Sequence, residues 1–225
     1  MIKVTLGEKY YWAEQLGAPD QPAPLVILLS GDESVQHMPV IRELLLPQIE
    51  AGRCQAFVIA GFGPTDWNRD YTPWHFADTG GRIFAGKADE TLEFMQNIVV
   101  PALQSKFSLN GEVYPVGYSL GGLTALYAHC RLGFSGCGSC SGSLWFPGWL
   151  DFLRQHRPSG KVYLSLGGKE ENTKDPLISE VGTITQKSKE LIAQSAKVTY
   201  VKEPGGHFRE IPQRIGRAIL WLLKP

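Results

Sequence analysis

Short apolar runs alternate with amphipathic segments along most of this chain. The apolar runs are bounded by turn residues, a pattern typical of strands buried on both faces of a parallel sheet, and they lie at 25–29, 56–60, 113–117, 161–166 and 197–201. The small-residue-rich segment at 136–143 is a plausible further strand. Segments with apolar residues at helical spacing lie at 38–51, 89–107, 149–155, 178–193 and 208–223. We therefore expect an α/β fold with a mostly parallel, doubly wound sheet and helices on both faces.

Prolines and the first residues refine this pattern. Residues 2–16 mix apolar and polar positions in the manner of a strand or a hairpin at a sheet edge. Pro19, Pro22 and Pro24 indicate a surface connection after it. Pro101 predicts a kink or break in the helical segment that contains it, because proline has no N–H to donate within a helix.

The run at 113–117 ends in Gly117-Tyr118-Ser119-Leu120-Gly121, and a helical pattern begins at once. Gly-x-Ser-x-Gly between a strand and a helix is typical of a nucleophile elbow, where a strained turn presents the serine hydroxyl. Side chains at Gly117 and Gly121 would collide with the turn and the neighbouring strand. The positive end of the new helix would favour negative charge at Ser119. Because an inert serine in a glycine-rich turn is the alternative, the chain must also supply a base and an acid.

The base is expected to be His207. The order nucleophile, acid, histidine is that of the α/β-hydrolase fold, and His207 follows the strand at 197–201 in a Pro-Gly-Gly-His turn. An imidazole there can accept the proton of Ser119 and later give it to the leaving group. The other histidines lack this place at a strand end: they are His37, His75, His129 and His156. Of these, His75 lies in the aromatic segment and could touch substrate.

A carboxylate must fix the tautomer of His207. Glu170, just after the strand at 161–166, is the first candidate, Glu171 is the second and Asp175 the third. Neighbouring residues on a turn point apart, so only one of the two glutamates can reach the imidazole. A solvated charged turn is the alternative without function.

An oxyanion hole needs two backbone N–H groups aimed at the developing charge. Leu120, the residue after the nucleophile, is expected to supply one. The turn after the strand at 25–29 is expected to supply the other, with Asp32 as the first candidate and Gly31 as the alternative. Asp32 would act through its backbone, with its side chain turned away from the oxyanion.

Residues 61–86 are long, glycine-rich and aromatic. A loop of this length is commonly functional or disordered, and its large aromatic side chains favour a packed loop beside a cleft. We expect Trp67, Tyr71 and Trp74, together with Trp145, to form the walls of the substrate site. The competing interpretation is that these rings only complete the core.

Composition bounds the class of protein. With 225 residues, 43% of them hydrophobic and 20% charged, the chain suits one globular domain over 1–225. The formal net charge is +0, so neither nucleic acid nor an anionic membrane is expected as a partner. No signal peptide or membrane-spanning segment is recognisable, which favours a cytoplasmic location. The oligomeric state stays open.

Four cysteines are too few and too unevenly spaced for a disulfide scaffold. Cys137 and Cys140 form a C-x-x-C pattern, but one pair supplies too few ligands for zinc and lies in a small-residue strand rather than at a helix N-terminus. No phosphate-binding or dinucleotide-binding fingerprint is present. We expect no metal and no cofactor.

Four segments, at 68–73, 117–122, 141–145 and 205–208, together resemble the putative-esterase family of α/β-hydrolases. That family includes siderophore esterases, S-formylglutathione hydrolase (esterase D) and the mycolyltransferase antigens, and the resemblance covers nearly the whole chain from Leu25. It implies serine hydrolysis of esters, with Ser119 and His207 matching the nucleophile and the base. The family's acid varies, and Gly167-Gly168-Lys169-Glu170 matches its Gly-x-x-acid pattern. Ser30-Gly31-Asp32 departs from the Asp-Gly-x of many relatives and leaves the second oxyanion donor open.

The combined interpretation is a metal-free serine esterase for a small-molecule ester. Ser119 would attack the carbonyl, His207 would act as base and then acid, Glu170 would orient His207, and water would release the acyl group. The chain from 143 to 161 is too short for a large lid domain, so we expect an open cleft able to admit a bulky or siderophore-type ester. Two alternatives remain: an acyltransferase with the same triad, and a non-catalytic ligand-binding protein on this fold. The natural substrate and its acyl-chain length stay open.

Overall fold

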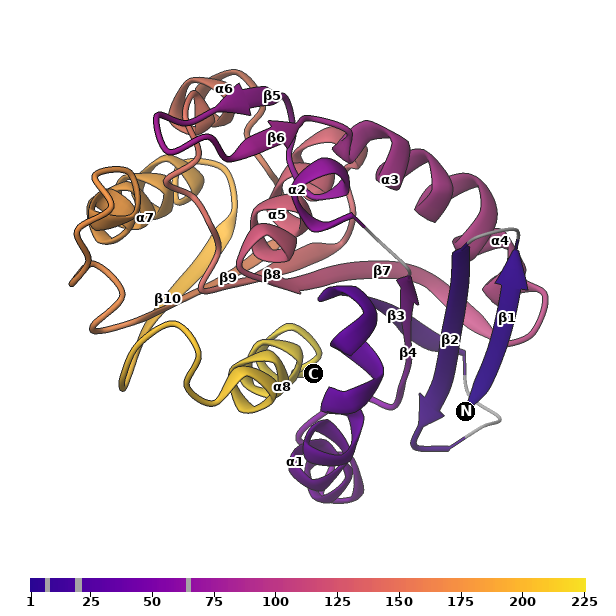
Figure 1. Ribbon diagram of the computed structural model, residues 1–225. Coiled ribbons are helices and arrows are strands. Elements are labelled where there is room, and N and C mark those ends of the chain that lie inside the picture. Colours follow the sequence, from indigo (N-terminus) through magenta and orange to yellow (C-terminus); the bar gives the residue numbers. More distant parts are fainter. Residues whose placement is uncertain (7–8, 19–21, 64–65) are drawn as a thin grey trace.

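A twisted sheet lies at the centre of the computed structural model, and helices pack on both of its faces (Figure 1). The structure describes residues 1–6, 9–18, 22–63 and 66–225. Within these residues the sheet has eight strands in the order β1-β2-β4-β3-β7-β8-β9-β10. The strands are β1 (Ile2–Leu6), β2 (Lys9–Leu16), β3 (Ala23–Leu29), β4 (Phe57–Gly63), β7 (Leu109–Tyr118), β8 (Gly136–Cys140), β9 (Lys161–Gly167) and β10 (Lys197–Glu203).

Strand pairing confirms the mostly parallel, doubly wound sheet that the sequence predicts. β4, β3, β7, β8, β9 and β10 are paired in parallel. β1 and β2 form an antiparallel hairpin, and β2 also pairs antiparallel with β4. The hairpin therefore ends one edge of the sheet, as expected for residues 2–16.

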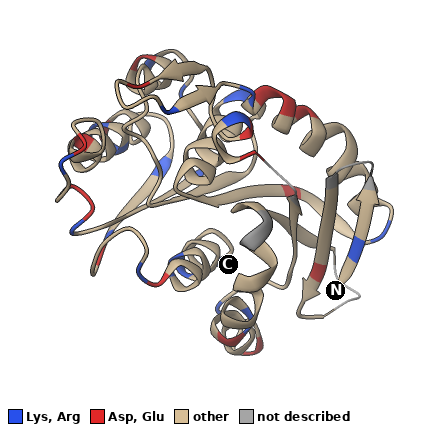
Figure 2. Cartoon of the chain, viewed as in Figure 1, with Lys and Arg blue, Asp and Glu red and all other residues tan. Residues whose placement is uncertain are grey.

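The helices divide between the two faces of the sheet, and each group encloses its own hydrophobic core. α1 (Met38–Glu50) and α8 (Ile211–Leu222) cover one face (Figure 1). The opposite face is covered by α3 (Ala88–Phe94), α4 (Val100–Gln104), α5 (Leu120–Leu132), α6 (Trp149–Gln155) and α7 (Val181–Ile192). None of the helices in the described ranges is both long and apolar enough to cross a bilayer. Acidic and basic residues are interspersed along the ribbon (Figure 2).

The aromatic segment after β4 is more structured than the single packed loop that we expected. It forms the short helix α2 (Trp67–Asp70) and an antiparallel hairpin of β5 (His75–Ala77) and β6 (Ile83–Ala85). Phe76 and Phe84 stack across the hairpin with ring centroids 5.9 Å apart, and both rings contact Phe146. The sequence did not predict these two strands, because three residues are too few to show an alternation of apolar and polar positions.

The prediction that Pro24 belongs to a surface connection is wrong, because this residue lies inside β3 and is buried. The register between β3 and β7 shifts at this point, since Ala23 pairs with Leu109 whereas Leu25 pairs with Val113. Proline has no ladder N–H to lose at such an irregularity, so the sheet accepts it there.

Pro101 breaks its helix as predicted. The turns of α3 widen into a π-helical segment (Met95–Val99) before α4 continues with Pro101 in its first turn.

α8 begins at Ile211 rather than at residue 208, because Glu210 takes a left-handed conformation with φ 56° and Pro212 suits only the first turn of a helix. Between β8 and β9 the chain forms α6 and short connections, so no large lid domain covers this edge, as expected.

The turn from β7 into α5 brings backbone segments unusually close together. A Cβ on Gly117 would lie 2.1 Å from the carbonyl oxygen of Gly121. A Cβ on Gly121 would lie 1.8 Å from the carbonyl oxygen of Leu29 on β3. Both positions therefore require glycine, because the atoms that a Cβ would meet belong to backbone that cannot move aside. The sequence analysis expected this.

Gly121→Ala should therefore lower the free energy of unfolding by about 2 kcal/mol or more, because the new methyl group forces β3 and α5 apart. Urea unfolding followed by circular dichroism measures this. Gly80→Ala is the matched control, since a Cβ there would meet its nearest atom at an ordinary 3.4 Å. Equal unfolding midpoints for the two variants would contradict the steric explanation.

Candidate active site

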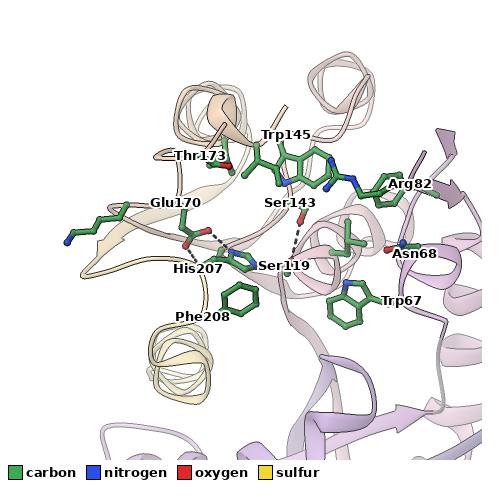
Figure 3. Close-up of a pocket in the computed structure, with 16 residues that line it drawn as sticks. Trp67, Asn68, Arg82, Ser119, Ser143, Trp145, Glu170, Thr173, His207 and Phe208 are labelled. Carbon is green, nitrogen blue, oxygen red and sulfur yellow. Dashed lines mark hydrogen bonds and ion pairs between the residues drawn. The ribbon is translucent and has the colours of Figure 1, made fainter. Parts of the chain in front are cut away.

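Ser119 stands at the turn between β7 and α5 in a strained backbone conformation, with φ 57° and ψ −123°. Its N–H donates to the carbonyl oxygen of Cys140 at the end of β8, over 3.1 Å. Its own carbonyl oxygen accepts from the N–H of Ser143 at 2.9 Å. The turn is thus fixed from both sides, and the hydroxyl faces a cavity at the carboxyl edge of the sheet (Figure 3).

His207 and Glu170 meet Ser119 from two other strand ends (Figure 3). His207 lies in the turn between β10 and α8, and its Nε2 is 3.0 Å from Oγ of Ser119. Glu170 lies in the turn after β9, and its Oε2 is 2.7 Å from Nδ1 of His207. The structure therefore brings the predicted serine, histidine and glutamate into one hydrogen-bonded chain.

The carboxylate of Glu170 is buried, with 3% of its side chain exposed. Burial opposes its ionisation, but hydrogen bonds and charge attraction from His207, with further hydrogen bonds from Ser141 and Gly167, outweigh that cost and lower the pKa of Glu170. Its Oε1 accepts from the N–H of Gly167 at 2.6 Å and from Oγ of Ser141 at 2.7 Å. The carboxylate is thus held in its charged form against the imidazole.

The competing acids lie away from the imidazole. Glu171 is exposed and turns toward Gly182 on α7. Asp175 forms an ion pair with Arg82 on the hairpin, with 2.5 Å between Oδ2 and Nη2. Of the two neighbouring glutamates, only Glu170 contacts His207, which agrees with their pointing apart.

The other histidines lie outside the cavity lining. His129 is buried in α5, where burial lowers its pKa and its Nε2 lies 2.7 Å from the carbonyl oxygen of Ser159. His75 is exposed on β5, and His156 stacks on Phe152 at the end of α6. His37 ends the 3₁₀ helix η1 (Gly31–His37), which follows β3.

Two backbone segments were expected to form an oxyanion hole. Leu120 is the first residue of α5, so its N–H has no partner within the helix, and it lines the cavity beside Ser119. Gly31 directs its N–H toward the hydroxyl of Tyr71 at 3.4 Å. No described residue of η1 lines the cavity, and the side chain of Asp32 lies outside the described residues. The second donor therefore stays a prediction.

The cavity above Ser119 has a volume of about 520 Å³. Trp67 and Trp145 line it, as the sequence analysis expected of the walls. Figure 3 shows these two indoles, with Phe208 beside His207. The remaining lining residues are Asn68, Arg82, Phe84, Leu120, Ser141, Ser143, Lys169, Glu170, Thr173, Ile178 and Val181.

The prediction that Tyr71 and Trp74 form walls of the substrate site is wrong, because neither residue lines this cavity. Tyr71 is completely buried, and its ring meets Trp67 edge-on with centroids 5.0 Å apart. Trp74 donates its indole N–H to the carbonyl oxygen of Pro147 at 2.8 Å and packs between Phe146 and Phe152. Both rings support the wall from behind, so for them the core interpretation was right.

Two residues at the site were not singled out in the sequence, although both lie in segments that carry the family resemblance. Ser143 places its Oγ 3.3 Å from Oγ of Ser119. Phe208 is 86% exposed at the cavity rim, with its ring edge-on to His207. Its apolar type directly after the predicted base was the one available clue to a substrate-facing position.

The C-x-x-C pair lies on β8, beneath the turn that carries Ser119. Cys137 and Cys140 are both free and fully buried. Burial raises the pKa of the Cys140 thiol to about 12, so it stays protonated at neutral pH.

Known proteins resemble this chain in sequence and in structure. The model of the family described as "Putative esterase" matches residues 2–210. The uncharacterized protein YbbA of Bacillus subtilis is 27% identical over 164 residues, which are 68% of this chain and 64% of that protein. The match thus spans less than two thirds of this relative's length.

Two solved structures share the fold at low sequence identity. The IroE-like serine hydrolase from Shewanella oneidensis superposes with a TM-score of 0.78 and 21% identity, over 96% of this chain and 75% of that chain. The enterobactin esterase FES from Shigella flexneri, solved in the presence of 2,3-Di-hydroxy-N-benzoyl-glycine, has a TM-score of 0.74 and 20% identity, over 98% of this chain and 58% of that chain. Because the family model matches residues 2–210, which is most of the 225-residue chain, this chain belongs to the family described as "Putative esterase".

Proposed function

We propose that this chain hydrolyses carboxylic esters through an acyl-enzyme on Ser119. The proposal is carried by one observation, the chain of two hydrogen bonds that joins Ser119 Oγ to His207 Nε2 at 3.0 Å and His207 Nδ1 to Glu170 Oε2 at 2.7 Å. A nucleophile, a base within reach of its proton and an acid that orients the base are the parts that acyl transfer requires. Membership of an esterase family supports an ester as the substrate.

In the first half of the reaction, Oγ of Ser119 attacks the ester carbonyl carbon while its proton moves to Nε2 of His207. Nδ1 must carry the other ring hydrogen, and Glu170 selects this tautomer by accepting it. Negative charge develops on the carbonyl oxygen near the N-terminus of α5. The N–H of Leu120 and the helix dipole stabilise it there.

In the second half, the proton on Nε2 passes to the alcohol oxygen as the carbon–oxygen bond breaks, which leaves the acyl group on Ser119. A water molecule takes the place of the alcohol and gives its proton to His207 as its oxygen attacks the acyl carbon. Ser119 regains the proton when the carboxylic acid leaves. The enzyme is thereby restored with no net gain or loss of protons at the triad.

The substrate class that the cavity favours is a bulky ester with an aromatic group. Trp67, Trp145 and Phe84 line the cavity, and the exposed ring of Phe208 lies at its rim. Rigid aromatic walls offer apolar contact at small entropic cost and can stack on a flat substrate. The enterobactin esterase with the same fold was solved with a benzoyl compound, which agrees with a siderophore-type or aryl ester.

Ser119→Ala should abolish covalent labelling by a fluorophosphonate, because it removes the hydroxyl whose proton the imidazole of His207 is placed to accept. Intact-mass analysis should show one adduct on the unmodified protein. Ser143→Ala is the control, since that hydroxyl lies near Ser119 but has no histidine partner among the hydrogen bonds of the described residues. Undiminished labelling of the Ser119 variant would show that the nucleophile lies elsewhere.

Glu170→Gln should lower kcat by on the order of 10²-fold or more and leave KM nearly unchanged, because the residue acts on the transition state through His207. Glu171→Gln is the matched control and should be nearly silent. Steady-state kinetics on one ester measure both variants. The reverse pattern would move the acid by one residue, and two silent variants would indicate a serine–histidine dyad.

Trp67→Ala should raise KM for a benzoyl ester about tenfold relative to an acetyl ester of the same alcohol, because only the larger acyl group reaches the indole. Trp74→Ala removes an indole that lies behind the wall and should affect both esters alike. Circular dichroism checks that both variants are folded. An equal loss on the two esters with Trp67→Ala would mean that this ring supports the fold rather than the substrate.

A further inference from the structure

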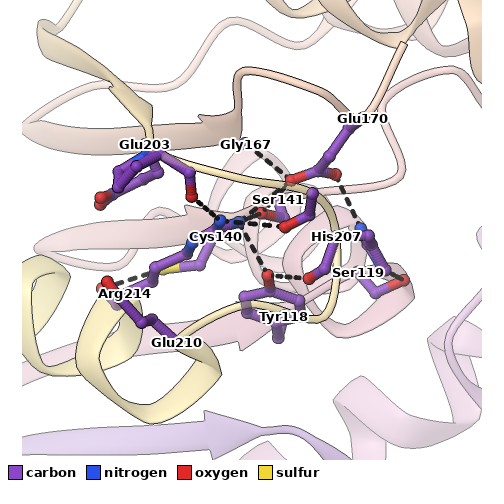
Figure 4. A network of polar contacts seen from close by, with 12 residues as sticks. Tyr118, Ser119, Cys140, Ser141, Gly167, Glu170, Glu203, His207, Glu210 and Arg214 are labelled. Carbon is purple, nitrogen blue, oxygen red and sulfur yellow. Dashed lines mark hydrogen bonds and ion pairs between the residues drawn. The ribbon is translucent and has the colours of Figure 1, made fainter. Parts of the chain in front are cut away.

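A fully buried arginine contacts both the acid and the turn that carries His207 (Figure 4). Arg214 lies in the first turn of α8, and its side chain has 0% exposure. Its Nη1 donates to Oη of Tyr118 at 3.0 Å, Oγ of Ser141 at 2.8 Å and Oε1 of Glu170 at 3.1 Å. Its Nη2 donates to the carbonyl oxygens of Pro204 and Gly206, both at 3.0 Å.

The hydrogen-bond directions in this network are mutually consistent when the two hydrogens of Nη1 are shared among its three acceptors. Ser141 has one hydroxyl proton and gives it to Oε1 of Glu170. Tyr118 gives its hydroxyl proton to the carbonyl oxygen of His207. Both hydroxyl oxygens therefore remain as acceptors for Arg214, whose guanidinium can only donate. The orientation of the guanidinium is thereby fixed by the same residues that hold the acid and the base.

Stability alone does not explain an arginine at this position. Burial of a charged pair commonly costs more than apolar side chains of the same volume would. The neighbours of Arg214 on the buried face of α8 are Ile215, Ala218 and Ile219, against which a methionine or leucine could pack. An apolar residue could not form hydrogen bonds with two separate turns at once. The planar guanidinium of arginine, with its five N–H donors, can do so.

We propose that Arg214 is a positioning residue that joins the Glu170 carboxylate and the His207 turn into one rigid unit. Through Nη1 it fixes which oxygen of Glu170 is left to face His207, and through Nη2 it fastens a Pro-Gly-Gly turn that has no long side chain of its own. Arg214 does not line the cavity, so it acts through these residues and not on the substrate. The inference rests on the proposed function.

Arg214→Met should lower kcat by on the order of 10²-fold with KM close to the wild-type value, because a shift of about 1 Å between His207 and Ser119 is enough for such a loss. Arg214→Lys should lose less, since an ammonium keeps the charge but cannot span both turns. Arg217→Met is the matched control. Arg217 lies one turn further along α8, pairs with Glu203 and, at 3.6 Å, with Glu210, and does not line the cavity, so kcat should be unchanged.

A double-mutant cycle with Glu170→Gln separates positioning from general destabilisation. Because Arg214 acts partly through Glu170, the losses in kcat should combine to less than their product. A full product, a raised KM with kcat intact, or unchanged kcat in the folded variants would overturn the proposal. If circular dichroism shows Arg214→Met unfolded, Arg214→Lys is measured in its place. A wild-type protein without esterase activity would count against the proposed function instead.

Discussion

The charged state of one buried carboxylate is the constraint on which the candidate site depends. Burial by itself would favour the protonated form of Glu170, so its ionisation requires the hydrogen bonds that surround it. These donors come from β9, from the residue after β8, from the turn before α8 and from α8 itself. The carboxylate therefore ties four separate parts of the chain together, and the orientation of His207 follows from that arrangement.

The parallel sheet explains why so few residues can form this site. β7, β8, β9 and β10 are consecutive neighbours in the sheet, and their carboxyl ends lie along one edge. Ser119 follows the first of these strands, Glu170 the third and His207 the fourth, while Ser141 and Ser143 follow the strand between. Each side chain needs only a short turn to reach the cavity, and the close contact of α5 with β3 fixes the turn that carries Ser119.

The sequence predicted the parts of the fold and site that leave a local pattern. Buried strands, the elbow with its two glycines, and the order of Ser119, Glu170 and His207 depend on neighbouring residues or on chain order, and the structure agrees with them. Tyr71 and Trp74 were misplaced because an aromatic ring has the same local signal in a core as in a cavity wall. Arg214 has a local pattern, since it lies at helical spacing from Ile211 and Ala218, but only the assembled sheet shows what it contacts.

The central claim is that Ser119 and His207 act as one catalytic unit. The most direct test compares kcat for Ser119→Ala, His207→Ala and the double variant on the same ester, with folding checked by circular dichroism. Residues that act as a unit lose their contribution together, so the double variant should be no slower than either single variant. Losses that multiply in the double variant, or a His207→Ala variant that keeps the wild-type kcat, would contradict the account.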